Sequence, residues 1–275
     1  MTPGEIKKVL GEIGGAPNKR LGQNFLIDEK VLADVVAAAR IDPGDKVLEI
    51  GPGLGVLTKA LVARGAEVVA IERDRRFVEY LQRAVSSKII QGDATEIHWH
   101  EIIGNGVWKF VSNLPYAITS FALRKALWNP NPPELLVALV QREVAERATS
   151  LASDVAGHRK KGKTSLLSLM VALASEEARV LRLVSADCFY PAPKVESAIL
   201  FIKPMPLIAR EKKWGIDPEK IMQLARRGFA HPRKLLRSNL GLPSTLYHLL
   251  SNPNSRAEDL SPEAWACLAR ELKSF

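Results

Sequence analysis

Residues 113–116 combine an amide, a rigid proline and an aromatic ring directly after an apolar, strand-like segment at residues 108–112. The side-chain oxygen of Asn113 and the backbone carbonyl of Leu114 could accept the two hydrogens of an exocyclic amine, while Pro115 fixes the backbone between them. Two such acceptors would free the lone pair of an adenine N6 nitrogen for alkylation, and Tyr116 offers a flat face for a flipped base. Taken alone, an Asn-x-Pro sequence is equally typical of a turn.

A second candidate site is the glycine-rich segment at residues 49–55, which follows the first predicted strand and precedes a helical segment. Gly51, Gly53 and Gly55 would let the backbone turn tightly and approach a ligand closely. A dinucleotide-binding G-x-G-x-x-G motif would need its third glycine at position 56, which is Val56. The spacing therefore favours S-adenosylmethionine, a ligand without phosphate, over a dinucleotide.

Two carboxylates follow at the ends of the next two predicted strands. Glu72 ends the second strand and could accept both ribose hydroxyls of the cofactor. Asp93 ends the third strand, just before Ala94, and could accept the amino group of the cofactor adenine. Ligands of doubly wound sheets bind outside the carboxyl ends of the strands. Candidate residues at four successive strand ends therefore indicate one site rather than isolated turns.

The elements that would position these residues repeat along the chain. Short apolar segments alternate with helical spacing, which predicts right-handed βαβ units and an α/β fold with a doubly wound, Rossmann-like sheet. Two later strands, at residues 178–184 and 196–202, lie too close together for a helical crossover, so we expect an antiparallel pair at one sheet edge. The strands that precede them are predicted at residues 46–50, 67–71, 88–91, 108–112 and 135–140.

The pattern changes after Lys203, where two nearby prolines interrupt the chain and a helical, loop-rich region begins. Asp217 and Ser261 are each followed by a proline, which is typical of a helix N-cap and first helical position. We therefore predict a methyltransferase domain at residues 1–203 and a small helical, RNA-contacting domain at residues 204–275.

Charge is distributed unevenly over the 275 residues, whose formal net charge is +9. Residues 203–240 hold ten basic and three acidic side chains, a net charge of +7, and residues 158–163 form a second cationic segment. Many charged segments are only solvated surface. Here the concentration of positive charge in one small domain, beside a site suited to adenine, favours contact with RNA phosphates.

Other classes of protein are disfavoured by composition. Cys188 and Cys267 have no partner spacing, so we expect neither a metal site nor a disulfide framework. The first nine residues lack the apolar core of a secretory signal, and no apolar run approaches the length of a membrane span. The sequence therefore predicts a cytoplasmic protein without a membrane segment.

Taken together, these residues resemble the ribosomal RNA adenine N6-dimethyltransferase family. The resemblance covers nearly the whole chain and rests on residues 19–26, 48–58, 92–94, 113–116, 141–147, 188–198 and 256–261. It implies a class I methyltransferase fold with a small C-terminal all-α domain, and S-adenosylmethionine as cofactor. The implied cofactor contacts are Asn24, Leu26, Gly51, Gly53, Glu72, Asp93, Ala94 and Asn113.

The same resemblance implies that Phe189 faces Tyr116 across the flipped base. Residues 189–195 and 256–261 look like the branch that dimethylates two adjacent adenosines near the 3′ end of small-subunit rRNA. We therefore expect a monomer that acts on an immature 30S-type particle. Ala117 stands where the family usually has Asn. Three alternatives remain: the macrolide-resistance branch that modifies large-subunit rRNA, a DNA adenine methyltransferase, and a non-catalytic ribosome assembly factor.

Overall fold

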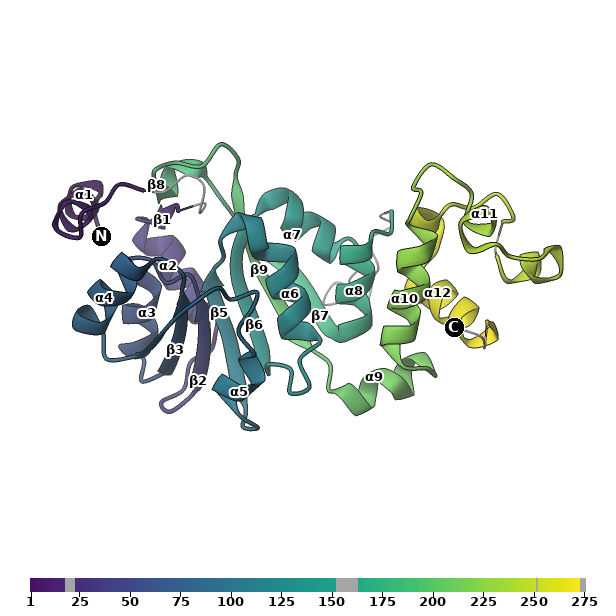
Figure 1. The fold of residues 1–275 in the computed structure, drawn as a ribbon, viewed down its shortest axis with the longest axis horizontal. Helices are drawn as coiled ribbons and strands as arrows, with labels where there is room; N and C mark the ends of the chain where they lie inside the picture. Colours follow the sequence, from purple (N-terminus) through teal and green to yellow (C-terminus); the bar gives the residue numbers. More distant parts are fainter. Residues whose placement is uncertain (18–22, 152–162, 251, 273–275) are drawn as a thin grey trace. The chain divides into compact units, whose positions relative to one another are not determined.

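Seven strands form the central sheet in the order β4-β3-β2-β5-β6-β9-β7 (Figure 1). Each neighbouring pair from β4 to β6 is parallel, whereas β9 pairs antiparallel with β6. The sheet confirms the predicted doubly wound α/β fold, and β9 and β7 are neighbours at the edge where we expected them. The strands are β2 (Lys46–Ile50), β3 (Glu67–Glu72), β4 (Lys88–Gln91), β5 (Trp108–Asn113), β6 (Leu135–Gln141), β7 (Ser175–Val184) and β9 (Ser197–Pro204).

This computed structural model describes residues 1–17, 23–151, 163–250 and 252–272. Part of the N-terminal motif, residues 19–22, and most of the predicted cationic segment, residues 158–162, lie outside the described residues.

Helices connect the parallel strands, as the alternating pattern predicts. Asp28 caps the helix before the sheet, because its carboxylate accepts the Val31 N–H at 2.8 Å. The helices of this region are α1 (Pro3–Glu12), α2 (Glu29–Ala38), α3 (Val56–Val62), α4 (Arg75–Ala84), α5 (Trp99–Ile103) and α6 (Thr119–Leu127), with a short 3-10 helix at Tyr116–Ile118.

The core lies where the sheet is covered on both faces. Residues 108–112 of β5 and residues 135–140 of β6 are buried without interruption, which is the pattern expected of central parallel strands. Val111 of β5 and alternate residues of β6 share a hydrophobic cluster with Val31 and Val35 of α2 and with Ile199 of β9. The carboxyl ends of the strands are therefore rigidly placed.

A short antiparallel pair joins two distant segments, and the sequence pattern does not predict it. In this pair β1 (Phe25–Leu26) lies against β8 (Phe189–Tyr190), with Leu26 opposite Phe189. The side chains of Ile6 and Leu10 from α1 pack in a cluster that includes Phe25. The pairing fixes the N-terminal segment beside the glycine-rich segment, because Phe25 contacts the position where a side chain on Gly53 would lie.

The chain divides into two compact units. The first contains residues 1–145 and 180–202, and the second contains residues 146–179 and 203–275. This division differs from a single boundary at residue 203, because α8 (Leu166–Ala174) packs against the C-terminal helices α10 and α12. The remaining helices are α7 (Arg142–Thr149), α9 (Leu207–Trp214), α10 (Pro218–Gly228), α11 (Leu236–Leu240) and α12 (Pro262–Glu271), with 3-10 helices at Ala186–Cys188, Ser244–Leu249 and Ala257–Asp259.

Both helix starts predicted in the second unit are confirmed. Asp217 accepts the N–H of Glu219 at the start of α10, and Ser261 accepts the N–H of Ala264 at the start of α12. Each helix has proline at its first position, where no intrahelical N–H partner is lost.

Candidate active site

The glycine-rich segment after β2 lies in direct contact with the loop that follows β5. Gly51 has a φ of +67°, and a Cβ atom built on it would lie 3.0 Å from Cγ of Pro115. Gly53 has a φ of +57°, and a Cβ atom there would lie 3.0 Å from the Phe25 ring. Side chains at these positions would therefore require both an unfavourable backbone conformation and displacement of a neighbour.

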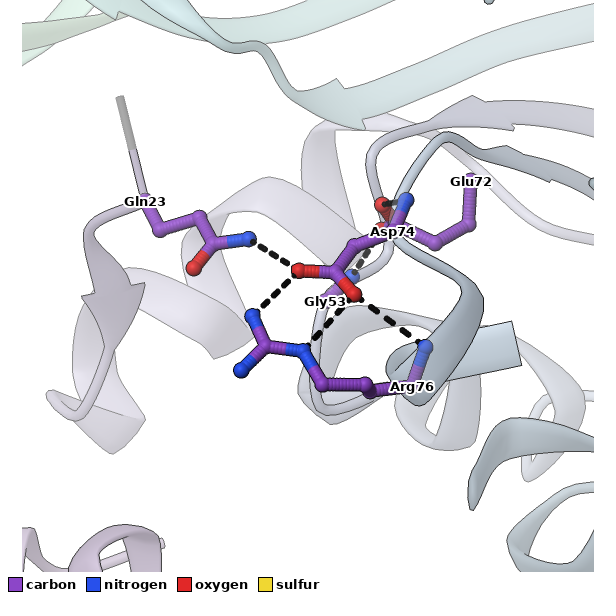
Figure 2. A network of polar contacts seen from close by, with 5 residues as sticks. All are labelled: Gln23, Gly53, Glu72, Asp74 and Arg76. Carbon is purple, nitrogen blue, oxygen red and sulfur yellow. Dashed lines mark hydrogen bonds and ion pairs between the residues drawn. The ribbon is translucent and has the colours of Figure 1, made fainter. Parts of the chain in front are cut away.

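Glu72 ends β3 with its carboxylate held by backbone donors. One oxygen accepts the Gly53 N–H at 3.1 Å and the other accepts the Asp74 N–H at 2.8 Å (Figure 2). The residue is only 6% exposed, and this burial raises the pKa of the carboxyl although the backbone hydrogen bonds oppose the rise. Each oxygen keeps a further lone pair, so the group can also accept hydrogen bonds from ligand hydroxyls.

A second carboxylate beside Glu72 ties the N-terminal segment to α4. Asp74 accepts hydrogen bonds from the Gln23 amide at 3.4 Å and from the Arg76 guanidinium at 2.6 and 3.0 Å (Figure 2). The hydrogen bonds from Arg76 hold the pKa of Asp74 below its usual range. This network places Gln23 at the edge of the same cavity that Glu72 lines.

Asp93 follows β4 and is held by its own turn. Its Oδ1 atom accepts the backbone N–H of Thr95 at 2.9 Å and the Thr95 hydroxyl at 2.7 Å. Its Oδ2 atom lies 3.2 Å from the Arg73 guanidinium. The Thr95 hydrogen bonds are the main reason that the pKa of Asp93 is lowered, so the group is ionised at neutral pH.

Residues 113–116 lead from the last residue of β5, Asn113, to the first residue of the 3-10 helix, Tyr116. The Asn113 amide donates to the backbone carbonyl of Asn24 at 3.1 Å, which makes its Oδ1 atom the accepting end of the amide. The N–H of Leu114 donates to the Leu139 carbonyl on β6 at 3.1 Å, and Leu114 is 1% exposed. Pro115 directly precedes the 3-10 helix that carries Tyr116.

Almost all of the predicted site residues line one cavity. Its lining includes the glycine-rich segment, both strand-end carboxylates and the loop after β5. The predicted residues that line it are Asn24, Leu26, Gly51, Gly53, Glu72, Asp93, Ala94, Asn113, Leu114, Pro115 and Tyr116. Five segments that are distant in sequence thus meet at the carboxyl ends of the strands.

Phe189 has a different position. It is 3% exposed, lies opposite Leu26 in the short β1–β8 pair and belongs to the hydrophobic core cluster. It is not among the described residues that line the cavity.

Glu49 also lines the cavity, although the sequence pattern predicts no role for it. It is 1% exposed, and burial raises the pKa of its carboxyl to about 8, although the Thr58 hydroxyl donates to it at 2.7 Å. The signal for it was its position as the first residue of the glycine-rich segment, two residues before Gly51. Gln23 and Asp74 had no comparable signal, because their contact depends on the tertiary fold.

Neither a metal cluster nor a membrane span was found in the part of the chain that the structure describes. No group of three or more His, Cys, Asp or Glu side chains is arranged there to hold a metal ion. Within the same residues, every helix is too short or too polar to cross a membrane.

Comparison with known proteins identifies the family. A family model described as "Ribosomal RNA adenine dimethylase" matches residues 15–273. The chain belongs to this family. It is 36% identical over 268 residues to "Ribosomal RNA small subunit methyltransferase A" of Dehalococcoides mccartyi, covering 92% of this chain and 87% of the relative. The protein of the same name from Thermosynechococcus vestitus is 36% identical over 272 residues, covering 94% and 97%.

Solved structures agree on the fold. A dimethyladenosine transferase from Plasmodium falciparum has a TM-score of 0.71 and 22% identity, covering 90% of this chain and 97% of that one. The 23S rRNA methyltransferase ErmE has a TM-score of 0.65 and 25% identity, covering 91% and 100%. The dimethyladenosine transferase fold is therefore present in this member of the family.

Membership makes this protein an rRNA adenine dimethyltransferase that uses S-adenosylmethionine, as the sequence resemblance implied. The cavity fits that cofactor chemically. It offers two strand-end carboxylates as acceptors, and its glycine-rich wall has no side chains at Gly51 and Gly53 to obstruct close approach.

Proposed function

We propose that the cavity binds S-adenosylmethionine and that residues 113–116 hold a flipped adenine beside it. The observation that carries this proposal is that Asn113, Glu72 and Asp93 line one cavity, although they come from three different strand ends. When bound, S-adenosylmethionine would supply an electrophilic methyl group to adenine N6, with S-adenosylhomocysteine as the leaving group.

In this proposal each cofactor-contacting residue has a distinct task. Glu72 accepts the ribose hydroxyls with the lone pairs that Gly53 and Asp74 do not use. Asp93 accepts the adenine amino group, and the buried Ala94 beside it packs against the ring. The other contacts are made by Asn24, Leu26, Gly51, Gly53 and Asn113.

Asn113 and Leu114 activate the target amine. The Asn113 amide is oriented by its hydrogen bond to the Asn24 carbonyl, so its oxygen can accept one N6 hydrogen. The Leu114 carbonyl accepts the other, which draws the N6 lone pair out of the ring. Positioning and fixed dipoles supply the acceleration, and the alkylated nitrogen is acidic enough to lose its proton to water.

Tyr116 is proposed to stack on the flipped base, with Phe189 as a second aromatic contact. Because Phe189 is 3% exposed and packed in the core, it must become accessible before it can touch a base. Phe189→Leu keeps the apolar contact and removes the aromatic face. Reduced methyl transfer with unchanged cofactor affinity would support base contact, whereas unchanged transfer would limit Phe189 to the core.

We infer that the substrate is small-subunit rRNA, modified at two adjacent adenosines near its 3′ end to give N6,N6-dimethyladenosine. The inference is supported by relatives at 36% identity that are named as small-subunit enzymes. The alternative, a large-subunit target, has the support of ErmE at 25% identity. We further propose that the protein acts as a monomer on an immature 30S-type particle in the cytoplasm.

The second unit is proposed to contact RNA phosphates. Its residues 203–240 carry a net charge of +7, and Arg233 and Lys234 are exposed. The exposed basic residues of this segment should displace counterions from the RNA on binding and make the affinity strongly salt-dependent.

The target is tested by incubating the protein and S-adenosylmethionine with unmodified small-subunit particles and, in parallel, with large-subunit RNA. Nucleoside mass spectrometry should detect dimethyladenosine in the small-subunit RNA alone. Product only in the large-subunit RNA would contradict the proposed target and favour the resistance-type activity. Absence of product in both, with cofactor bound, would favour an assembly role or a DNA substrate.

A further inference from the structure

Lys125, on α6, reaches the turn that carries Asp93. Its Nζ atom donates to the backbone carbonyls of Ala94 and Thr95, each at 3.1 Å. The same ammonium lies 5.3 Å from the centre of the Trp99 ring and 5.2 Å from that of Phe121. Two carbonyls and two aromatic faces thus surround one cation, which favours a fixed position for it.

Other contacts also hold this turn, among them the hydrogen bonds from Thr95 to the Asp93 carboxylate. The Ala94 carbonyl also accepts the Trp99 indole N–H at 2.9 Å, and the Asp93 carbonyl accepts the N–H groups of Glu96 and Ile97. Lys125 links two successive carbonyls of the turn, those of Ala94 and Thr95, to helix α6. Without this link, the segment from Asp93 to Thr95 loses its tie to α6, and a small shift of the turn would change the direction of the Asp93 carboxylate.

Electrostatics add a second effect. The positive charges of Arg73 and Lys125 help to keep the pKa of Asp93 low, after the larger effect of the Thr95 hydrogen bonds. Burial lowers the pKa of Lys125 itself, and the Asp93 charge opposes this. An ionised Asp93 is a stronger acceptor for an amino group than a protonated one.

We propose that Lys125 is a positioning residue for the adenine end of the cofactor, acting through the carbonyls of Ala94 and Thr95. It aims the Asp93 carboxylate at the adenine amino group and so contributes to the selection of adenine over a base with oxygen in that place. This inference rests on the proposed role of Asp93 as the acceptor of that amino group.

The test compares two ligands that differ at this one group. S-adenosylhomocysteine has the adenine amine, and S-inosylhomocysteine has an oxygen there. Calorimetric titration of Lys125→Met should show a Kd for S-adenosylhomocysteine raised about 3- to 10-fold, the size of one neutral hydrogen bond, because Lys125 acts through the turn and does not touch the ligand. The Kd for S-inosylhomocysteine should change less than about twofold, so the preference for adenine should shrink.

Two variants control this result. Lys125→Arg can still donate to both carbonyls and should restore part of the preference. Lys59→Met removes another lysine that lies over an aromatic ring, 5.7 Å from the Tyr80 centroid, and should leave both affinities unchanged. In steady-state assays Lys125→Met should raise the KM for S-adenosylmethionine more than it lowers kcat.

Two outcomes would overturn the proposal in distinguishable ways. Equal weakening of both ligands in Lys125→Met, or no weakening of either, would show that Lys125 has only a packing role. A wild-type protein that binds both ligands equally would contradict the assignment of Asp93, and the role of Lys125 would be overturned together with it.

Discussion

The phenolic oxygen of Tyr116 lies 2.7 Å from the hydroxyl oxygen of Ser197, a residue 81 positions later in the chain. Ser197 is fully buried at the start of β9, where it lies opposite Gln141 of β6. The proposed stacking ring is thus anchored to the sheet rather than only to its own loop. Burial raises the pKa of Tyr116, so the phenol remains neutral at physiological pH.

Removing this anchor should affect turnover more than cofactor binding. Ser197→Ala deletes the hydroxyl and lets the Tyr116 ring reorient, so kcat should fall about 3- to 10-fold, the size of one or two neutral hydrogen bonds. Tyr116→Phe should give a similar loss, and the double variant should lose little more than either single variant. Losses that multiply in the double variant would show that the two hydroxyls act independently.

Because the glycine-rich segment contacts Pro115, adding a single methyl group at Gly51 should weaken cofactor binding. Gly51→Ala places a Cβ atom 3.0 Å from the Pro115 ring at a φ of +67°, so it should distort the cavity and weaken cofactor binding at least tenfold. Gly44→Ala is the matched control, because Gly44 has a φ of +88° but no atom within 4 Å of the added carbon. Gly44→Ala should lower stability by about 1 kcal/mol and leave the cofactor Kd unchanged. Equal cofactor affinities in the two variants would contradict this account.

Glu49 should make stability fall as pH rises. Its pKa is about 8 in the folded protein and near 4.5 when exposed, so between these values the folded state holds a proton that the unfolded state releases. The free energy of unfolding must then decrease with pH across this range. Glu49→Gln removes that titration. The free energy of unfolding of Glu49→Gln, relative to that of wild type, should therefore increase from pH 5 to pH 8. If the urea midpoints of the two proteins changed in parallel with pH, the raised pKa of Glu49 would be disproved.

Basic residues of the second unit should contribute to RNA affinity through salt-dependent contacts. The double substitution Arg233→Glu and Lys234→Glu should weaken rRNA binding and reduce the slope of log K against log salt by about 2. Cofactor affinity should not change. Lys59→Glu, at an exposed position on α3, is the control and should alter RNA binding far less. Filter-binding titrations from low to moderate salt measure these slopes.

Sequence alone predicted the sheet and most of the cavity because both depend on local signals. Glu72, Asp93 and Asn113 each end or follow an apolar segment, and parallel strands bring such ends to one edge. The β1–β8 pair is different: two-residue strands show no periodicity, and their partners are more than 160 positions apart. The buried position of Phe189 follows from that pair, although an aromatic residue before a proline turn is also typical of a core position in the sequence.

The organisation of the second unit was also only partly predictable. Proline pairs mark the starts of α10 and α12, and these signals are local. The assignment of residues 146–179 to this unit depends on the packing of α8 against α10 and α12, which no composition change in the sequence marks. From the sequence alone, the apolar helix α8 could equally have packed against a sheet.

The central claim is that Asn113 activates the target amine, and one comparison tests it most directly. Wild type and Asn113→Ala are incubated with small-subunit particles, and dimethyladenosine is measured by nucleoside mass spectrometry alongside RNA binding. The account predicts that Asn113→Ala binds RNA normally and loses at least 100-fold in methyl transfer, about the loss seen when a group that stabilises transition-state charge is removed. Methyl transfer by Asn113→Ala at the wild-type rate would contradict it.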